Sequence, residues 1–185
     1  MLDDGDLIVN ETNSTKADWV HAALRQYEGP LIRYAAQITG DLDRARDVVQ
    51  DTFIRLCAEP QDRVEPHLAQ WLFKVCRNRA LDVRRKESRM KTLDDTEMNL
   101  QVSNEPSPSA ESREAAGEVQ RLLGTLSDNQ QEVVRLKFQN GLSYQEISNI
   151  TNLTVTNVGF LIHTAIKSLR QQMQPGFAIN QRKTP

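Results

Sequence analysis

The stretch that decides the fold runs from Leu142 to Met173 and reads LSYQEISNITNLTVTNVGFLIHTAIKSLRQQM. Its Ser143–Glu146 segment has the form of a capping box, which opens a short helix that we expect to end near Ile150. Thr154 can cap a longer helix that continues to Met173. Only residues 151–153 separate the two helices, so the sequence predicts a helix-turn-helix.

The longer helix has one apolar and one polar stripe at helical spacing. The apolar stripe consists of Val155, Val158, Ile162, Ala165 and Leu169, and the opposite stripe of Thr156, Asn157, Phe160, Thr164, Lys167 and Gln171. In a DNA-binding helix-turn-helix the first turn of the second helix meets base edges, where Asn can contact adenine and Thr a thymine methyl group. The candidate DNA-binding residues are therefore Thr154, Thr156, Asn157, Phe160 and Lys167. The alternative is a four-helix packing unit that binds no DNA.

Upstream of this motif, the pattern continues as helices. We expect one helix over 114–126, and a second capping box at Ser127–Gln130 that opens a helix ending near Phe138. Residues 113–174 therefore form one small helical domain. Before it, residues 92–112 are acidic, contain Pro106 and Pro108, and predict a flexible linker. Residues 1–16 and 175–185 are expected to be loose tails.

Residues 17–91 predict a second helical domain. Its first helix, over 18–39, is expected to bend at Gly29-Pro30, and its second, over 41–57, is expected to be capped by Asp41 or Asp43. A loop over 58–65 should follow. The residues that face inward at helical spacing are Val20, Leu24, Tyr27, Leu31, Tyr34, Ala35 and Ile38 in the first helix, and Ala45, Val48, Val49, Thr52, Phe53 and Leu56 in the second.

A third helix of this domain, ending near Arg89, is strongly basic. One face carries Lys74, Arg77, Asn78, Leu81, Arg84 and Arg85, and another carries the expected core residues Leu68, Trp71, Leu72 and Val75. A cationic stripe on a rigid helix is typical of contact with a phosphate backbone. The alternative is a solvated helix end, in which Asp82 pairs with neighbouring cations.

The bulk composition excludes several classes of function. The 185 residues carry a net charge of −2 and no apolar run long enough to span a membrane, and the acidic N-terminus does not resemble a secretory signal. The two cysteines, Cys57 and Cys76, fit a reducing cytoplasm, and we expect both in the core rather than as a redox pair or metal ligands. No cofactor, metal or small-molecule substrate is expected.

An enzyme is the most distant alternative. Asp41, Asp43, Asp47 and Asp51 lie on roughly one side of a helix, as metal-binding acids can, but no second acidic cluster faces them in the sequence. No glycine-rich phosphate loop or nucleophile–base arrangement occurs. We therefore expect these acids to be solvated, and we expect no enzymatic activity.

Several segments together resemble bacterial RNA polymerase sigma factors. Residues 47–56, DVVQDTFIRL, are similar to region 2.2, residues 71–85, WLFKVCRNRALDVRR, to regions 2.3 and 2.4, and residues 126–170 to region 4. The acidic linker stands where larger sigma factors carry another domain, and its shortness resembles the extracytoplasmic-function (ECF) group. The resemblance implies an all-α fold of two small helical domains, with region 2 over 17–91 and region 4 over 113–174.

The resemblance also implies partners and site residues. Asp47, Gln50, Asp51 and Phe53 would bind core RNA polymerase, and Lys74, Arg77, Asn78, Arg84 and Arg85 would bind the −10 promoter element. The loop with Pro66 and His67 would cradle a flipped-out base. The −35 element would contact Thr154, Thr156, Asn157, Phe160 and Lys167. An anti-sigma factor is a further expected partner.

The chain departs from the family where the recognition helix usually carries Lys-Ser-Arg and further arginines. Those places hold Gly159, Phe160, Leu161, Thr164 and Ile166, so fewer phosphate contacts are available. Phe160 could press on thymine methyl groups, contact a protein partner, or be an isolated surface aromatic. The competing function is a helix-turn-helix transcriptional regulator that acts without core polymerase, which would need a ligand pocket or dimer interface within residues 17–91.

Overall fold

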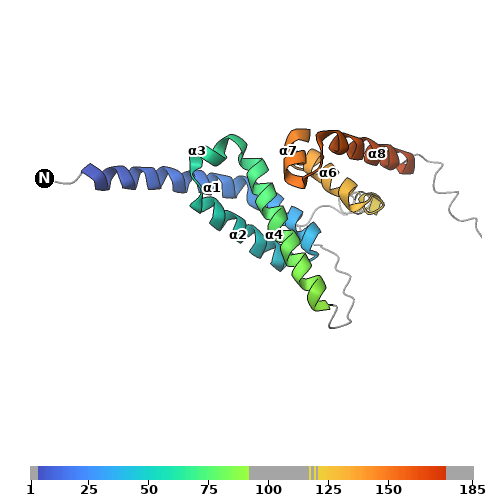
Figure 1. The fold of residues 1–185 in the computed structure, drawn as a ribbon, viewed down its shortest axis with the longest axis horizontal. Helices are drawn as coiled ribbons and strands as arrows, with labels where there is room; N and C mark the ends of the chain where they lie inside the picture. The colour runs from blue at the N-terminus through green and yellow to red at the C-terminus, as the bar shows by residue number, and fades with distance from the viewer. Residues whose placement is uncertain (1–3, 92–116, 118, 120, 174–185) are drawn as a thin grey trace, which may run out of the picture. The chain divides into compact units, whose positions relative to one another are not determined.

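The protein folds into two separate helical units. The structure, a computed structural model, describes residues 4–91, 117, 119 and 121–173, and all regular secondary structure within these ranges is helical. Unit 1 comprises Met1–Val102 and unit 2 comprises Ser103–Pro185. The predicted all-α, two-domain fold is therefore confirmed (Figure 1). The expected linker over 92–112 and tail over 175–185 lie outside the described residues.

Unit 1 is built around three long helices. They are α1 (Asp4–Thr39), α2 (Leu42–Ala58) and α4 (Leu68–Lys91), with the short α3 (Gln61–Val64) and the 3-10 helix η1 (Glu65–His67) between the last two. Each of the three long helices packs against the other two (Figure 1). Their shared core includes Leu31, Ala35, Val48, Leu56, Leu72 and Phe73.

The first helix differs from its prediction at two places. α1 begins at Asp4, so the tail expected over 1–16 is wrong from that residue on. Once a helix is nucleated, each further residue costs little, and no proline interrupts this segment. Leu24, expected inside, is 37% exposed. α1 also continues without interruption through Pro30, and the bend expected there stays a prediction.

A short connection turns the chain from α1 into α2. Gly40 has φ +72°, a conformation that glycine adopts without strain, and a carboxylate oxygen of Asp41 accepts a hydrogen bond from the backbone N of Arg44 at 2.8 Å. This is the predicted N-cap. The six residues expected on the inner face of α2 are all buried. Cys57, in the last turn, is exposed instead of buried, because it lies outside that face.

The segment expected as a loop over 58–65 is mostly helical. Pro60 is the N-cap of α3 and has an extended backbone conformation. Pro66 lies in the first turn of η1, where its missing N–H costs nothing. Only Glu59 and Pro60 lie outside helices between Ala58 and Gln61. Val64, 1% exposed, fixes this segment to the core.

The buried face of α4 is rotated from the predicted one. Leu72 is buried as expected, but Leu68, Trp71 and Val75 are only half-buried. The other buried residues are Phe73, Cys76 and Ala80. The Phe73 ring meets that of Tyr34 edge to face, with centroids 5.3 Å apart. Since α4 packs against both α1 and α2, its buried face extends past Leu72 to include Phe73.

Unit 2 contains α6 (Asp128–Phe138), α7 (Tyr144–Thr151) and α8 (Val155–Met173). Both predicted capping boxes are present: the backbone N of Ser127 donates to Gln130 Oε1 at 3.1 Å, and that of Ser143 donates to Glu146 Oε2 at 2.7 Å. Of the helix expected over 114–126, residues 117, 119 and 121–123 are helical, but the chain turns at residues 124–126, so the helix ends about three residues earlier than expected. Leu122 and Leu123 from the helix and Leu126 from the turn belong to the core.

The two thiols provide a test of the packing in unit 1. Cys76 is 0% exposed, and burial raises the pKa of its thiol to about 12, although a hydrogen bond with Thr52 acts in the opposite direction. Because the thiolate is the reactive form, a raised pKa leaves Cys76 protonated and inert at pH 8. We expect a chromogenic disulfide reagent to titrate one thiol in the native protein and two in guanidinium chloride.

The Cys57→Ser variant is the control, and it should show no fast-reacting thiol in the native state. Equal reaction rates of both cysteines at pH 8 would contradict the packing of α4 described above.

Candidate functional site

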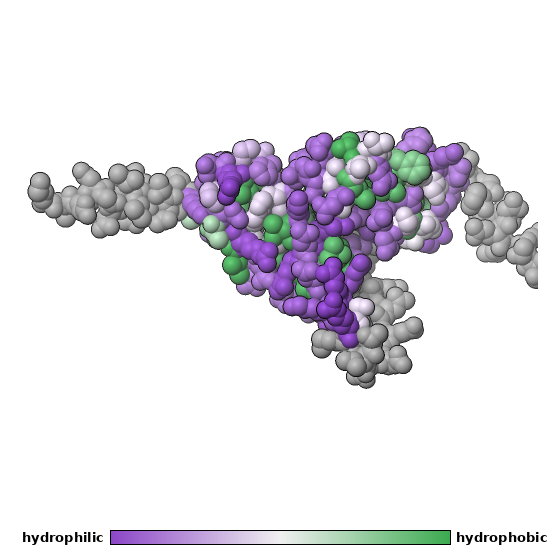
Figure 2. Space-filling view, viewed as in Figure 1, coloured by the Kyte–Doolittle hydropathy of each residue, from purple (hydrophilic) through white to green (hydrophobic). Residues whose placement is uncertain are grey.

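The cationic face predicted on α4 is open to solvent in unit 1. By helical spacing, Lys74, Asn78 and Arg85 lie opposite the buried face, with Arg77 and Arg84 on one flank. Asn78, Arg84 and Arg85 are exposed, while Lys74 and Arg77 are half-buried. Figure 2 shows strongly hydrophilic surface over the C-terminal part of α4. The packing of the helix thus brings all five predicted residues to one solvent-facing region.

Ion pairs between described residues lie beside this face. Asp82 pairs with Arg85 at 3.4 Å, which is the kind of pairing expected of a solvated helix end. Both side chains are more than half exposed. Arg79 Nε donates to an Asp51 carboxylate oxygen at 2.8 Å, and Arg44 pairs with Glu87. The last two pairs join α2 to α4. Toward the described residues, the side chains of Lys74, Asn78 and Arg84 form no hydrogen bond or ion pair.

The residues predicted on α2 divide into three environments. Asp47 and Gln50 are exposed on the outer face of the helix. Asp51 is half-buried, because it pairs with Arg79. Phe53 is only 6% exposed, so its ring belongs to the core surface and not to a free edge. We call the exposed side chains of Asp47 and Gln50 the polar edge of α2.

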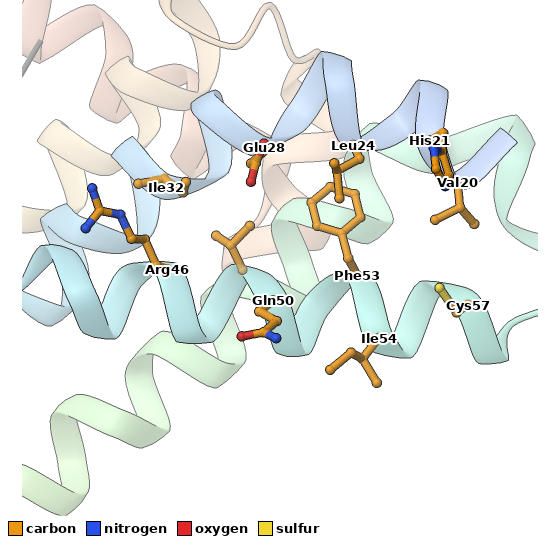
Figure 3. Close-up of a pocket in the computed structure, with 11 residues that line it drawn as sticks. Val20, His21, Leu24, Glu28, Ile32, Arg46, Gln50, Phe53, Ile54 and Cys57 are labelled. Atoms are coloured by element: carbon orange, nitrogen blue, oxygen red, sulfur yellow. The ribbon is translucent and has the colours of Figure 1, made fainter. Parts of the chain in front are cut away.

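An apolar groove between α1 and α2, with a volume of about 480 Å³, runs beside this edge (Figure 3). Val49 and Phe53 are buried beneath it, while Leu24 and Ile54 are exposed by 37% and 60%. The residues that line it are Val20, His21, Leu24, Glu28 and Ile32 from α1, and Arg46, Val49, Gln50, Phe53, Ile54 and Cys57 from α2. This groove was not predicted from the sequence. The available signal was Ile54, an apolar residue outside the inner face of its helix.

In unit 2, hydrogen bonds hold the predicted helix-turn-helix in place. Asn152 takes the left-handed conformation at φ 60° between α7 and α8, and the Ser148 hydroxyl donates to the Leu153 carbonyl at 2.6 Å. Thr154 accepts a hydrogen bond from the backbone N of Asn157 at 3.2 Å, which makes it the predicted N-cap. The two helices and their turn are therefore confirmed.

The outer face of α8 carries the predicted reading residues. Thr154, Thr156, Asn157 and Lys167 are exposed, and Phe160 is 63% exposed. The opposite stripe packs inward through Val158, Ile162 and Ala165, with Leu169 against the same core. Val155 was expected inside but is 39% exposed, because it lies in the first turn, ahead of the packed part of the helix.

Neither a candidate metal centre nor a candidate membrane-spanning helix is found in the described part of the chain. The described residues contain no group of three or more His, Cys, Asp or Glu side chains that could hold a metal ion. Within the same ranges, no helix combines the length and apolar character required to cross a membrane.

Comparisons with known proteins agree with this arrangement. Residues 23–90 match the family described as Sigma-70 region 2, and residues 116–169 match Sigma-70, region 4. The ECF RNA polymerase sigma factor SigL of Mycobacterium tuberculosis is 29% identical over 174 residues, covering 90% of this chain and 95% of that protein. The ECF RNA polymerase sigma factor SigM of Bacillus subtilis is 26% identical over 146 residues, covering 79% and 90%.

Two solved structures resemble the fold. The sigma factor RpoE of Bartonella quintana, in complex with the anti-sigma factor NepR, aligns with a TM-score of 0.65 and 24% identity, covering 83% of this chain and 95% of that one. CnrH, in complex with the cytosolic domain of CnrY, aligns with a TM-score of 0.56 and 23% identity, covering 83% and 86%. Both family regions occur here in order, each on its own helical unit, and the chain belongs to the sigma-70 family of RNA polymerase sigma factors, in its ECF group.

Proposed function

We propose that this chain is an alternative sigma factor, which binds core RNA polymerase and directs promoter recognition and transcription initiation. The observation that carries the proposal is the presence of regions 2 and 4 in one chain, over 23–90 and 116–169. A helix-turn-helix regulator would account for region 4 but would leave the match of residues 23–90 to region 2 unexplained. The family consists of transcription initiation factors, so we assign no enzymatic activity, and we expect the protein to act in the cytoplasm.

The outer face of α2 supports the assignment of the polymerase-binding surface. Gln50 and the exposed side chain of Ile54 line the apolar groove, and Asp47, also exposed, lies two turns before Ile54 on the same helix. Interfaces combine an apolar centre with a polar rim in this way. We assign Phe53 to the floor of the groove. Asp51 pairs with Arg79 in the free chain, and we assign it to a polymerase contact that would replace this ion pair.

The outer face of α4 supports the assignment of the −10 surface. Lys74, Arg77, Arg84 and Arg85 supply positive charge for backbone phosphates, and Asn78 supplies an amide for a base or sugar edge. Pro66 and His67, in the exposed η1, are the candidates for holding a flipped-out base. Unstacking a base costs a few kcal/mol, which its capture in a pocket offsets.

The outer face of α8 supports the assignment of the −35 surface to Thr154, Thr156, Asn157, Phe160 and Lys167. With so few cations, this unit should bind DNA feebly when alone. We assign the domains as region 2 over 17–91, a flexible linker over 92–112 and region 4 over 113–174. The linker raises the effective concentration of each region for its promoter element once the other is bound.

An anti-sigma factor is the further partner we propose. Both similar structures are complexes with a second protein, which in one of them is named an anti-sigma factor. A partner of this kind would cover the apolar and cationic faces described above and keep the free chain from polymerase.

Reconstitution tests the function as a whole. Purified chain and core RNA polymerase should form a stable complex on a native gel, and the complex should yield run-off transcripts from promoters of the parent genome. The chain alone should neither select a promoter nor open it. Failure to associate with core polymerase would contradict the function, and sequence-selective binding by the chain alone would favour the regulator.

Charge removal tests the face of α4. Arg84→Ala combined with Arg85→Ala should slow promoter opening about tenfold or more. When log affinity for promoter DNA is plotted against log salt concentration, the slope should become less steep by about 1.4 to 1.8, because two phosphate contacts are lost. Lys86→Ala is the matched control, since this exposed cation of the same helix lies on the other flank. Equal effects of the two changes would contradict a role for this particular face.

Substitution at the groove tests polymerase binding. Ile54→Asp should weaken association with core polymerase by about tenfold, which corresponds to about 1.4 kcal/mol, because a charge would then lie in an apolar contact. Asp47→Lys should slow association and alter its salt dependence. Asp62→Lys is the control, a charge reversal on the exposed face of α3. If it weakens binding as much as Asp47→Lys, the effect is one of net charge and the assigned surface is wrong.

A further inference from the structure

The outer face of α8 has an apolar centre where polar readers are expected. Phe160 lies almost opposite the buried stripe of Val158, Ile162 and Ala165, and 63% of its surface is exposed. By helical spacing Thr156 and Lys167 flank it on the same face. Burial of an exposed phenyl ring against an apolar group is favourable, so this ring is available for such a contact at the centre of the face.

The backbone that carries Phe160 is held firmly. The Thr164 hydroxyl donates to the Phe160 carbonyl at 2.9 Å, and the same hydroxyl oxygen accepts a hydrogen bond from Gln130 Nε2 at 3.1 Å. Gln130 lies in the first turn of α6, which packs against α8. This turn of the recognition helix is therefore tied to the core of unit 2, and the ring is presented from a fixed backbone. Such rigidity suits a residue that selects between closely similar partners.

The chemistry of the ring limits what it can select. Phenylalanine has no hydrogen-bonding group, and the apolar feature that bases offer in the major groove is the C5-methyl group of thymine. Guanine and cytosine edges would instead lose hydration against the ring without gaining a hydrogen bond, which is unfavourable. α8 contains no acid, and its only Lys and Arg residues, Lys167 and Arg170, lie in its second half. The first half of the helix therefore lacks the arginine–guanine contacts that are the commonest specific contact.

We propose that Phe160 is a specificity-determining residue that contacts thymine methyl groups, so that this protein selects its upstream promoter element largely by apolar contact. The proposal rests on the proposed function and deepens it, since it names the base chemistry that unit 2 recognises. Thr156, one turn earlier on the same face, extends the apolar contact through its own methyl group. Asn157 supplies the hydrogen bonds to an adenine edge beside it.

The first test identifies the bases that the intact holoenzyme prefers. Core polymerase reconstituted with the full chain selects duplexes from a library randomised upstream of a fixed −10 segment. Wild type should enrich thymine at one or two upstream positions, and Phe160→Ala should lose that enrichment. Phe138→Ala is the matched control, because Phe138 is also 60% exposed but lies on α6; it should keep the enrichment. Phe160→Leu, still apolar, should keep part of it.

The second test removes the methyl group alone. The selected duplex is prepared with thymine or with uracil at the enriched positions, which changes no hydrogen-bonding group. Wild-type holoenzyme should bind the uracil duplex about fourfold more weakly per contacted methyl, the factor that corresponds to about 0.8 kcal/mol. Holoenzyme with Phe160→Ala should bind both duplexes equally.

The outcomes separate this proposal from the function on which it rests. If wild type forms no active holoenzyme, the proposed function itself fails. If the holoenzyme initiates transcription but binds thymine and uracil duplexes equally, the methyl contact is overturned. Weaker association of Phe160→Ala with core polymerase, without any thymine preference in wild type, would identify the ring as a protein contact and would also overturn it.

Discussion

The functional surfaces of unit 1 depend on how α4 is rotated about its own axis. Burial of Leu72, Phe73, Cys76 and Ala80 sets that rotation, and the edge-to-face contact between Phe73 and Tyr34 fixes it against α1. Because a helix exposes whatever it does not bury, the same packing turns Lys74, Asn78 and Arg85 toward solvent. The ion pairs Arg79–Asp51 and Arg44–Glu87 stand where α4 meets α2. The cationic face is thus a consequence of core packing.

In unit 2 the corresponding constraint is a set of local hydrogen bonds. Capping at Ser143 and Thr154, with the left-handed Asn152 between them, fixes the angle at which α8 leaves the turn. These contacts are all close in sequence, and so each could be predicted from the residue types alone. Only one face of α8 packs on the core beneath them, which leaves its outer face as surface available to a partner.

Sequence patterns predicted local structure well and long-range surfaces poorly. The inner face of α2 and both capping boxes follow from spacing within one helix, and all were found. The buried face of α4 was predicted wrongly, because α4 packs against two helices and both of them determine which of its residues are buried. Cys57 and Leu24 were taken as core for the same reason, since periodicity cannot tell a buried stripe from the rim of a groove. The groove is formed by two helices, and within a single segment its signal is Ile54, an apolar residue outside the inner face of α2.

The proposed recognition surfaces of the two units differ in physical kind. α4 concentrates cations, whose attraction to phosphate acts over a Debye length and takes no account of sequence. The first half of α8 has no Lys or Arg and places an aromatic ring at the centre of its outer face, and apolar contact acts only at close range and depends on the base. On the proposed function, the cations of α4 add affinity and the apolar contact of α8 adds selectivity, and the two act together when both units are held on one assembly. The shortage of cations on the recognition helix therefore makes its selectivity conditional on the polymerase that carries it.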